Sequence, residues 1–169
     1  DRKQPDTSVY RHIEASLPNV TLSADRFLVA CGTRPLRRPD VPFDGSRVFD
    51  SDQLLWGGVT TVPRNLIVIG AGVIGMEYAS MINIIPGTTV TVIDPRDDVL
   101  GFADREVVQA LCYSMRKNGA RFLMGEKVKS VEKSADGVVV AHLLSGKRVT
   151  GDALLYAMGR LGNTDSLDL

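Results

Sequence analysis

A short apolar run that stops at a glycine turn, and then continues with helical spacing, constrains the fold of this chain most. The run spans Leu66–Ile69, the turn holds Gly70, Gly72 and Gly75 in the spacing GxGxxG, and the apolar stretch continues to Ile85. β-Branched residues bounded by turn signals are typical of a buried strand, and apolar residues three and four apart are typical of a helix. The sequence therefore predicts a strand, a tight turn and a helix in direct succession.

The glycine spacing suits the approach of a phosphate group. Gly70 permits the sharp turn out of the strand, Gly72 has no Cβ to keep a ligand away, and Gly75 allows the helix to pack closely on the strand. The N–H groups and the positive dipole end of the helix then face the anion. This predicts a dinucleotide pyrophosphate site. The residues of the predicted site are Gly70, Ala71, Gly72, Val73, Ile74 and Gly75.

A second predicted strand, residues 89–93, ends in Asp94, 24 positions after Gly70. An acidic side chain there is expected to accept hydrogen bonds from the adenosine ribose hydroxyls. Arg96 follows two residues later, and a guanidinium within reach can form charge-assisted bonds to the 2′-phosphate of NADP. The pair predicts a site that accepts both NAD and NADP, although an ordinary surface arginine beside its acidic neighbours fits the same residues.

Composition excludes several classes of function. The chain has 169 residues with 20 basic and 20 acidic side chains, and its charges form no block that predicts a nucleic-acid surface. The apolar runs are too short to span a membrane, and the polar start predicts no signal peptide. The first residue is not Met, so the interior of a longer protein is expected. Cys31 and Cys112 have no redox or zinc spacing, and both are predicted to be buried side chains of a cytoplasmic protein.

The pattern around the glycine turn predicts further strands and helices. Residues 27–31 are predicted to be an apolar strand, and Asp50 or its neighbours are expected to cap a short helix that ends at 56. A helix from about 104 to 118 is predicted, followed by a strand at 121–124. Its apolar face is expected to consist of Val107, Val108, Leu111, Cys112 and Met115.

The pattern of apolar and polar residues changes after residue 124. Residues 128–132, 138–143 and 148–149 alternate apolar and polar side chains between Asp-Gly and Ser-Gly turns, which predicts an antiparallel meander. Residues 153–157 form a continuous apolar run that is typical of a buried strand. The fold class predicted is therefore α/β, a Rossmann-like three-layer domain with a parallel sheet and an antiparallel β-meander.

Three segments resemble the FAD-dependent pyridine nucleotide-disulfide oxidoreductases. Residues 28–35 are similar to the "ATG" segment that precedes the NAD(P) domain of that family, and residues 70–79 are similar to its glycine turn and helix. Residues 152–163 resemble the segment that returns to the flavin domain. The resemblance implies a flavin-domain stub and linker at 1–45, an NAD(P)-binding domain at 46–158 and a return segment at 159–169.

The resemblance also implies function. Residues 93–97 and 159–165 are similar to a branch of the family that transfers hydride between NADPH or NADH and NAD(P)⁺ through FAD. The implied cofactors are NAD and NADP, with FAD in the full-length protein. The implied partners are the flavin and dimerisation domains of the same protein, in a homodimer, with no nucleic acid and no membrane.

Three further site residues follow from the resemblance alone. Glu77 is implied to lie near the junction of nicotinamide and flavin, the backbone of Val128 to border the adenine, and Gly159 to approach the nicotinamide. No residue of the chain is assigned as catalytic.

Other functions fit parts of the same pattern. One alternative is a domain of a disulfide reductase resembling dihydrolipoamide dehydrogenase. Another is a non-catalytic module that binds or senses NAD(H). An S-adenosylmethionine site uses a similar turn, but a methyltransferase has no place for the antiparallel insertion.

Overall fold

The computed structural model describes residues 25–26, 28–56 and 59–167. The chain divides into two units, residues 1–30 and 31–169. Every helix and strand given below belongs to the second unit. The boundaries implied by the family resemblance, at 45 and 158, stay a prediction.

A parallel sheet of five strands forms the centre of the second unit. Strand β3 is followed by the glycine turn and by helix α3 (Val73–Asn83), whose N-cap is Gly72. The predicted succession of strand, turn and helix is therefore confirmed. In spatial order the strands are β2 (Val48–Asp50), β9 (Ala153–Tyr156), β3 (Asn65–Ile69), β4 (Thr89–Asp94) and β5 (Arg121–Met124).

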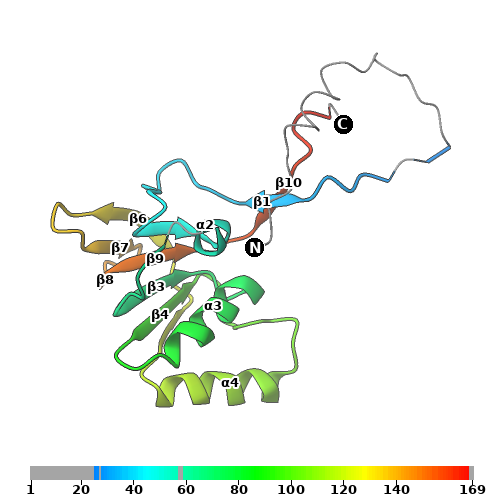
Figure 1. Ribbon diagram of the computed structural model, residues 1–169. Helices are drawn as coiled ribbons and strands as arrows, with labels where there is room; N and C mark the ends of the chain where they lie inside the picture. The colour runs from blue at the N-terminus through cyan, green and yellow to red at the C-terminus, as the bar shows by residue number, and fades with distance from the viewer. Residues whose placement is uncertain (1–24, 27, 57–58, 168–169) are drawn as a thin grey trace, which may run out of the picture. The chain divides into compact units, whose positions relative to one another are not determined.

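Both faces of this sheet are buried, which makes the domain three-layered. Along β3, Leu66 and Val68 belong to one apolar cluster, with residues of α3 and α4 (Arg105–Lys117), while Ile67 and Ile69 belong to another. The alternation follows from the period of two in a strand. Figure 1 shows the two helices on one side of β3 and β4 and the remaining layer on the other.

That remaining layer is the predicted meander. Strands β6 (Val128–Lys133), β7 (Val139–Leu143) and β8 (Arg148–Gly151) pair antiparallel in this order. Their inward side chains, including Val139 and Ala141, pack in one cluster with Ile67 of β3. The three-layer α/β prediction with its parallel sheet and meander is confirmed.

Aspartate side chains cap the starts of α2 and α4, and of these two caps only the one at Asp50 was predicted from the sequence. Asp104 accepts bonds from the backbone of Glu106 and Val107 at the start of α4, and Asp50 forms a capping box with Gln53 at the start of α2 (Ser51–Leu55). The predicted face of α4 is wrong at one position. Val107 is 66% exposed, because burial follows the spacing 108, 111, 112 and 115, and residue 107 lies about 90° from the centre of that stripe.

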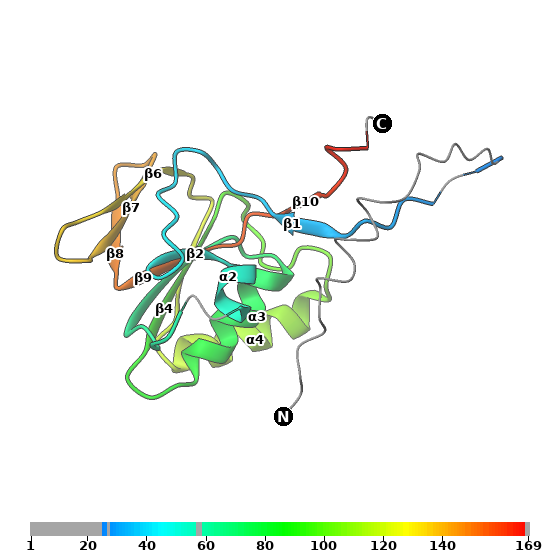
Figure 2. The same ribbon diagram turned by 45° about the horizontal axis from the view of Figure 1, so that its top comes forward.

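Two short strands join the ends of the domain. β1 (Thr33–Pro35) pairs antiparallel with β10 (Arg160–Gly162), and both views show them side by side (Figures 1 and 2). Arg160 donates to the Thr33 carbonyl at 2.9 Å and to the Asp52 carboxylate at 2.8 Å, so it ties this ribbon to α2. The strand predicted at 27–31 is wrong: residues 28–31 are not strand, and β1 begins after them. Cys31 is exposed, unlike the buried Cys112, so its predicted burial is also wrong.

Close packing explains why Gly75 has no side chain. A Cβ added there would lie 1.9 Å from the Gly70 carbonyl oxygen, whereas a Cβ on Gly72 would meet nothing nearer than 4.0 Å. The helix thus contacts the strand through Gly75, while Gly72 has free space in front of it.

We predict that Gly75→Ala destabilises the fold by about 1–3 kcal/mol, because overpacking against backbone forces α3 away from β3. Gly72→Ala is the matched control and should change the free energy of unfolding by less than about 0.5 kcal/mol. Denaturant unfolding followed by circular dichroism measures both. Equal stability of the two variants would contradict the packing argument.

Candidate functional site: the carboxyl edge of the parallel sheet

The glycine turn lies where the strand order of the parallel sheet reverses. From β3 the chain continues outward to β4 and β5, whereas β9 lies on the other side of β3. Ligands of open α/β sheets bind at such a point, outside the carboxyl ends of the strands. A cavity of about 460 Å³ lies there. Its lining residues are Gly70, Gly72, Val73, Ile74, Pro95, Arg96, Ala157, Met158 and Gly159.

The cavity has the features of an anion site. The first turn of α3 carries backbone N–H groups that no carbonyl of the same helix can accept, starting at Val73 and Ile74. Two lining glycines leave room: a Cβ on Gly159 would meet no atom within 4 Å, and one on Gly72 would approach only Arg96. None of the residues that the structure describes fills the space that a side chain at either position would take. The residues therefore fit the pyrophosphate and nicotinamide parts of a dinucleotide.

The structure brings together most of the sequence-predicted pyrophosphate residues. Gly70, Gly72, Val73 and Ile74 line the cavity. Ala71 and Gly75 are buried behind it. The Ala71 N–H donates to Asp94 at 2.7 Å, so this amide supports the turn and is not directed to a ligand.

Asp94 lies at the end of β4 and is fully buried. Besides Ala71, its carboxylate accepts from the Arg96 backbone N–H at 2.8 Å and from the guanidinium Nε and Nη2 at 2.9 and 2.7 Å. Burial by itself raises the pKa of the Asp94 carboxyl, but the bonds from Arg96 and Ala71 outweigh it and leave the pKa below its usual value. Asp94 is therefore a carboxylate at neutral pH.

Arg96 is the cation at the rim of the cavity. Its side chain is 63% exposed while its fork is paired with Asp94. The Asp94 carboxylate raises the pKa of the Arg96 guanidinium above its ordinary value, through hydrogen bonds first and charge second. The structure pairs Arg96 with Asp94 and not with the aspartates that follow it in the sequence.

The residues implied by family resemblance lie at three different places. Gly159 lines the cavity. Val128 lines a second cavity of about 200 Å³, which also contains Arg38 and shares Pro95 and Met158 with the first. Glu77 is exposed on α3 and lines neither cavity. Val128 therefore lies in a cavity next to the glycine-turn site, whereas Glu77 lies outside both cavities.

Sequence reasoning missed three residues of the main cavity: Pro95, Ala157 and Met158. Each directly follows a strand, Pro95 after β4 and the other two after β9. The signal that could have found them is geometric, because carboxyl ends of adjacent parallel strands meet at one edge. The reversal of strand order between β3 and β9 is not readable from local patterns.

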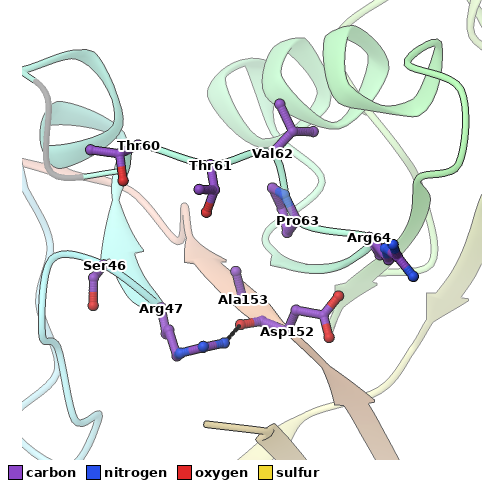
Figure 3. Close-up of a pocket in the computed structure, with 9 residues that line it drawn as sticks. All are labelled: Ser46, Arg47, Thr60, Thr61, Val62, Pro63, Arg64, Asp152 and Ala153. Atoms are coloured by element: carbon purple, nitrogen blue, oxygen red, sulfur yellow. Dashed lines mark hydrogen bonds between the residues drawn. The ribbon is translucent and has the colours of Figure 1, made fainter.

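A polar cavity of about 290 Å³ lies at the opposite, amino edge of the sheet (Figure 3). Its arginines are not assembled around a common point: Arg47 donates to the Asp152 carbonyl at 3.1 Å, and the Arg64 side chain points away from the other lining residues (Figure 3). Asp152 adds a carboxylate to the same wall. This cavity therefore lacks the arrangement of a phosphate site.

Other site types find no support in the part of the chain that the structure describes. No cluster of metal-ligating side chains occurs among those residues. No helix among them has the length and apolar character needed to cross a membrane.

A family model described as "Pyridine nucleotide-disulphide oxidoreductase" matches residues 7–168. The chain belongs to this family.

Individual curated relatives give a more specific comparison than the family model. The chain is 43% identical over 156 residues to a protein of Mycobacterium tuberculosis (strain ATCC 25177 / H37Ra) named "Soluble pyridine nucleotide transhydrogenase". It is 46% identical over 148 residues to the protein of the same name from Pseudomonas aeruginosa (strain LESB58). These matches cover 92% and 88% of the chain but 32% and 31% of the relatives. The chain thus spans about a third of their length.

Solved structures agree with the fold. LpdA from Mycobacterium tuberculosis matches with a TM-score of 0.73 and 30% identity, over 82% of this chain and 29% of that one. The flavoprotein disulfide reductase RclA from Escherichia coli matches with a TM-score of 0.70 and 28% identity, over 82% of this chain and 31% of that one.

The lowered pKa of Asp94 gives a prediction for stability. Its stabilising contribution is present above the unfolded-state value of about 3.9 and is lost as the pH falls toward the lower folded-state pKa. The free energy of unfolding of Asp94→Asn should therefore fall further below that of the wild type at pH 7 than at pH 3. Urea unfolding at both pH values measures the difference. Asp98→Asn, at an exposed position of the same loop, should cost little at either pH, and a constant penalty for Asp94→Asn would contradict the ionic role.

Proposed function

We propose that the chain is the NAD(P)-binding part of an FAD-dependent transhydrogenase that works in the cytoplasm. The observation that carries the proposal is the cavity at the reversal of strand order, where Gly72 and Gly159 leave room for a ligand. The two curated relatives, at 43% and 46% identity, support the choice of reaction.

In this proposal each side of the cavity has a separate task. The first turn of α3 binds the pyrophosphate through Val73 and Ile74, Gly70 permits the turn, and Gly72 allows the close approach of the phosphates. Gly159, between β9 and β10, borders the nicotinamide, and Val128 borders the adenine across the shared residues Pro95 and Met158. A nicotinamide cofactor supplies hydride chemistry when bound, and the chain itself binds and orients it.

The flavin and dimerisation domains of the same protein are the proposed partners, in a homodimer. Supporting this, the chain spans about a third of its curated relatives. The β1–β10 ribbon provides paired connections through which the domain is joined to a flavin domain.

Glu77 is proposed to act at the junction with that flavin domain. An exposed carboxylate on a helix with buried Met76 and Ala79 beside it is suited to pair with a cation outside the chain. That pair would orient the side of α3 that faces the flavin. Glu77 itself does not line the glycine-turn cavity.

We predict that Gly72→Ala lowers the affinity for both NAD⁺ and NADP⁺ at least tenfold, because the added methyl group occupies the space in front of the turn. Calorimetric titration of the 169-residue chain measures the affinity. Gly101→Ala is the control, since a Cβ there makes only an ordinary contact of 3.7 Å and Gly101 lies outside the cavity lining. Unchanged binding by Gly72→Ala would refute the placement of the dinucleotide.

The reaction is tested on the full-length protein loaded with FAD. Transhydrogenase function predicts that NADPH reduces an NAD⁺ analogue at a rate well above that for reduction of a disulfide substrate. A faster disulfide reduction would favour the reductase alternative, since RclA, which this chain resembles in fold, is named as a flavoprotein disulfide reductase.

A further inference from the structure

Arg160 joins the β1–β10 ribbon to the body of the domain. Its guanidinium donates from Nε to the Thr33 hydroxyl at 2.7 Å and from Nη2 to the Thr33 carbonyl at 2.9 Å. It also donates from Nη1 to the carboxylate of Asp52, in the first turn of α2, at 2.8 Å. One side chain of β10 therefore contacts both the neighbouring strand β1 and the helix α2.

The pairing of Arg160 with Asp52 fixes the direction of the guanidinium. Nη1 bonds to Oδ1 and Nη2 to Oδ2 of the same carboxylate, at 2.8 and 3.3 Å. Two parallel bonds hold the plane of the group, which the point charge of a lysine cannot do. The hydrogen bonds from Arg160 lower the pKa of the Asp52 carboxyl below its ordinary value, so both partners are charged at neutral pH.

The fastened end of the ribbon lies next to the dinucleotide cavity. Gly159, the residue before Arg160, lines that cavity. The Gly159 carbonyl accepts from the N–H of Leu36, the residue after β1, at 2.9 Å. The ribbon therefore begins at the edge of the sheet where the dinucleotide is proposed to bind. A rotation of the ribbon relative to α2 would change the direction in which the cavity faces the rest of the protein.

A second arginine of the ribbon makes bonds of a different kind. Arg34 of β1 donates to the Gly162 carbonyl at 3.1 Å and pairs with Asp165. Both partners lie in β10 or shortly after it, so these bonds hold the ribbon together without reaching α2. Within the part of the chain that the structure describes, Arg160 and not Arg34 connects the ribbon to that helix.

We propose that Arg160 is a positioning residue, which holds the β1–β10 ribbon on α2 and so sets the angle at which the dinucleotide cavity faces the flavin domain. This deepens the proposed function and rests on it. Hydride transfer requires reacting atoms that are about 3–3.5 Å apart and aligned, so a small error in this angle lowers the rate. The affinity for the cofactor depends mainly on the glycine turn, which the ribbon does not contact.

Stopped-flow kinetics on the full-length protein loaded with FAD test the proposal. Reduction of the flavin is followed at increasing NADPH concentrations, which gives the limiting rate and the dissociation constant separately. Arg160→Gln should lower the limiting rate about tenfold and change the dissociation constant less than about twofold, because the cavity is intact but misdirected. Arg34→Gln is the matched control: it removes an arginine of the same ribbon that has no bond to α2, and both values should stay at those of the wild type.

Further variants identify the contact through which Arg160 acts. Asp52→Asn should lower the limiting rate by nearly the same factor as Arg160→Gln, and the double variant should lower it no further, because the two residues form one contact. Arg160→Lys retains the charge but loses the two-pronged pairing. Its limiting rate should fall between those of the wild type and Arg160→Gln, and it keeps the test decisive if Arg160→Gln does not fold.

Three results would overturn the proposal. An equal loss of rate in Arg34→Gln would mean that the cohesion of the ribbon matters and its attachment to α2 does not. A loss in Arg160→Gln that falls mainly on the dissociation constant would make Arg160 part of the binding site. Wild-type kinetics in both Arg160 variants would remove any role in transfer. The proposed function fails separately, if NADPH does not reduce the flavin of the wild-type protein.

Discussion

The contact between Gly75 and the Gly70 carbonyl is the constraint on which the site depends. It allows α3 to begin directly on β3, so that the first turn of the helix faces the carboxyl edge of the sheet. Asp94 secures the same turn from the neighbouring strand through its bond to Ala71. The position of the amides that are proposed to bind the anion is therefore set by backbone packing and one buried carboxylate.

Local patterns predicted the elements of this fold because each pattern has a local cause. The helical spacing of the apolar residues predicted α4, and the alternation in β6, β7 and β8 followed from a sheet with one buried face. The errors occurred where burial depends on distant partners. Val107 is apolar but lies beside the buried stripe of α4, and the apolar run before Cys31 is not strand in residues 28–31.

The candidate site was predictable to the same extent. The glycine spacing located the turn and the first helix residues, because those requirements belong to one continuous segment. Pro95, Ala157 and Met158 could not be found that way, since they reach the cavity only through the order of strands in the sheet. The bonds of Asp94 were also beyond the sequence: the spacing shows that Arg96 is near, but not that its fork occupies the whole carboxylate.

The β1–β10 ribbon has a mechanical consequence. The chain enters and leaves the domain through two antiparallel strands, and Arg160 fastens them to α2 while Asn163 bonds back to the Gly32 carbonyl. Two separate tethers would allow the domain to swivel freely, but two strands bonded side by side bend much more easily across their plane than within it. The ribbon itself is therefore stiffer within its own plane than across it, so bending at this point of the chain is expected mainly across that plane.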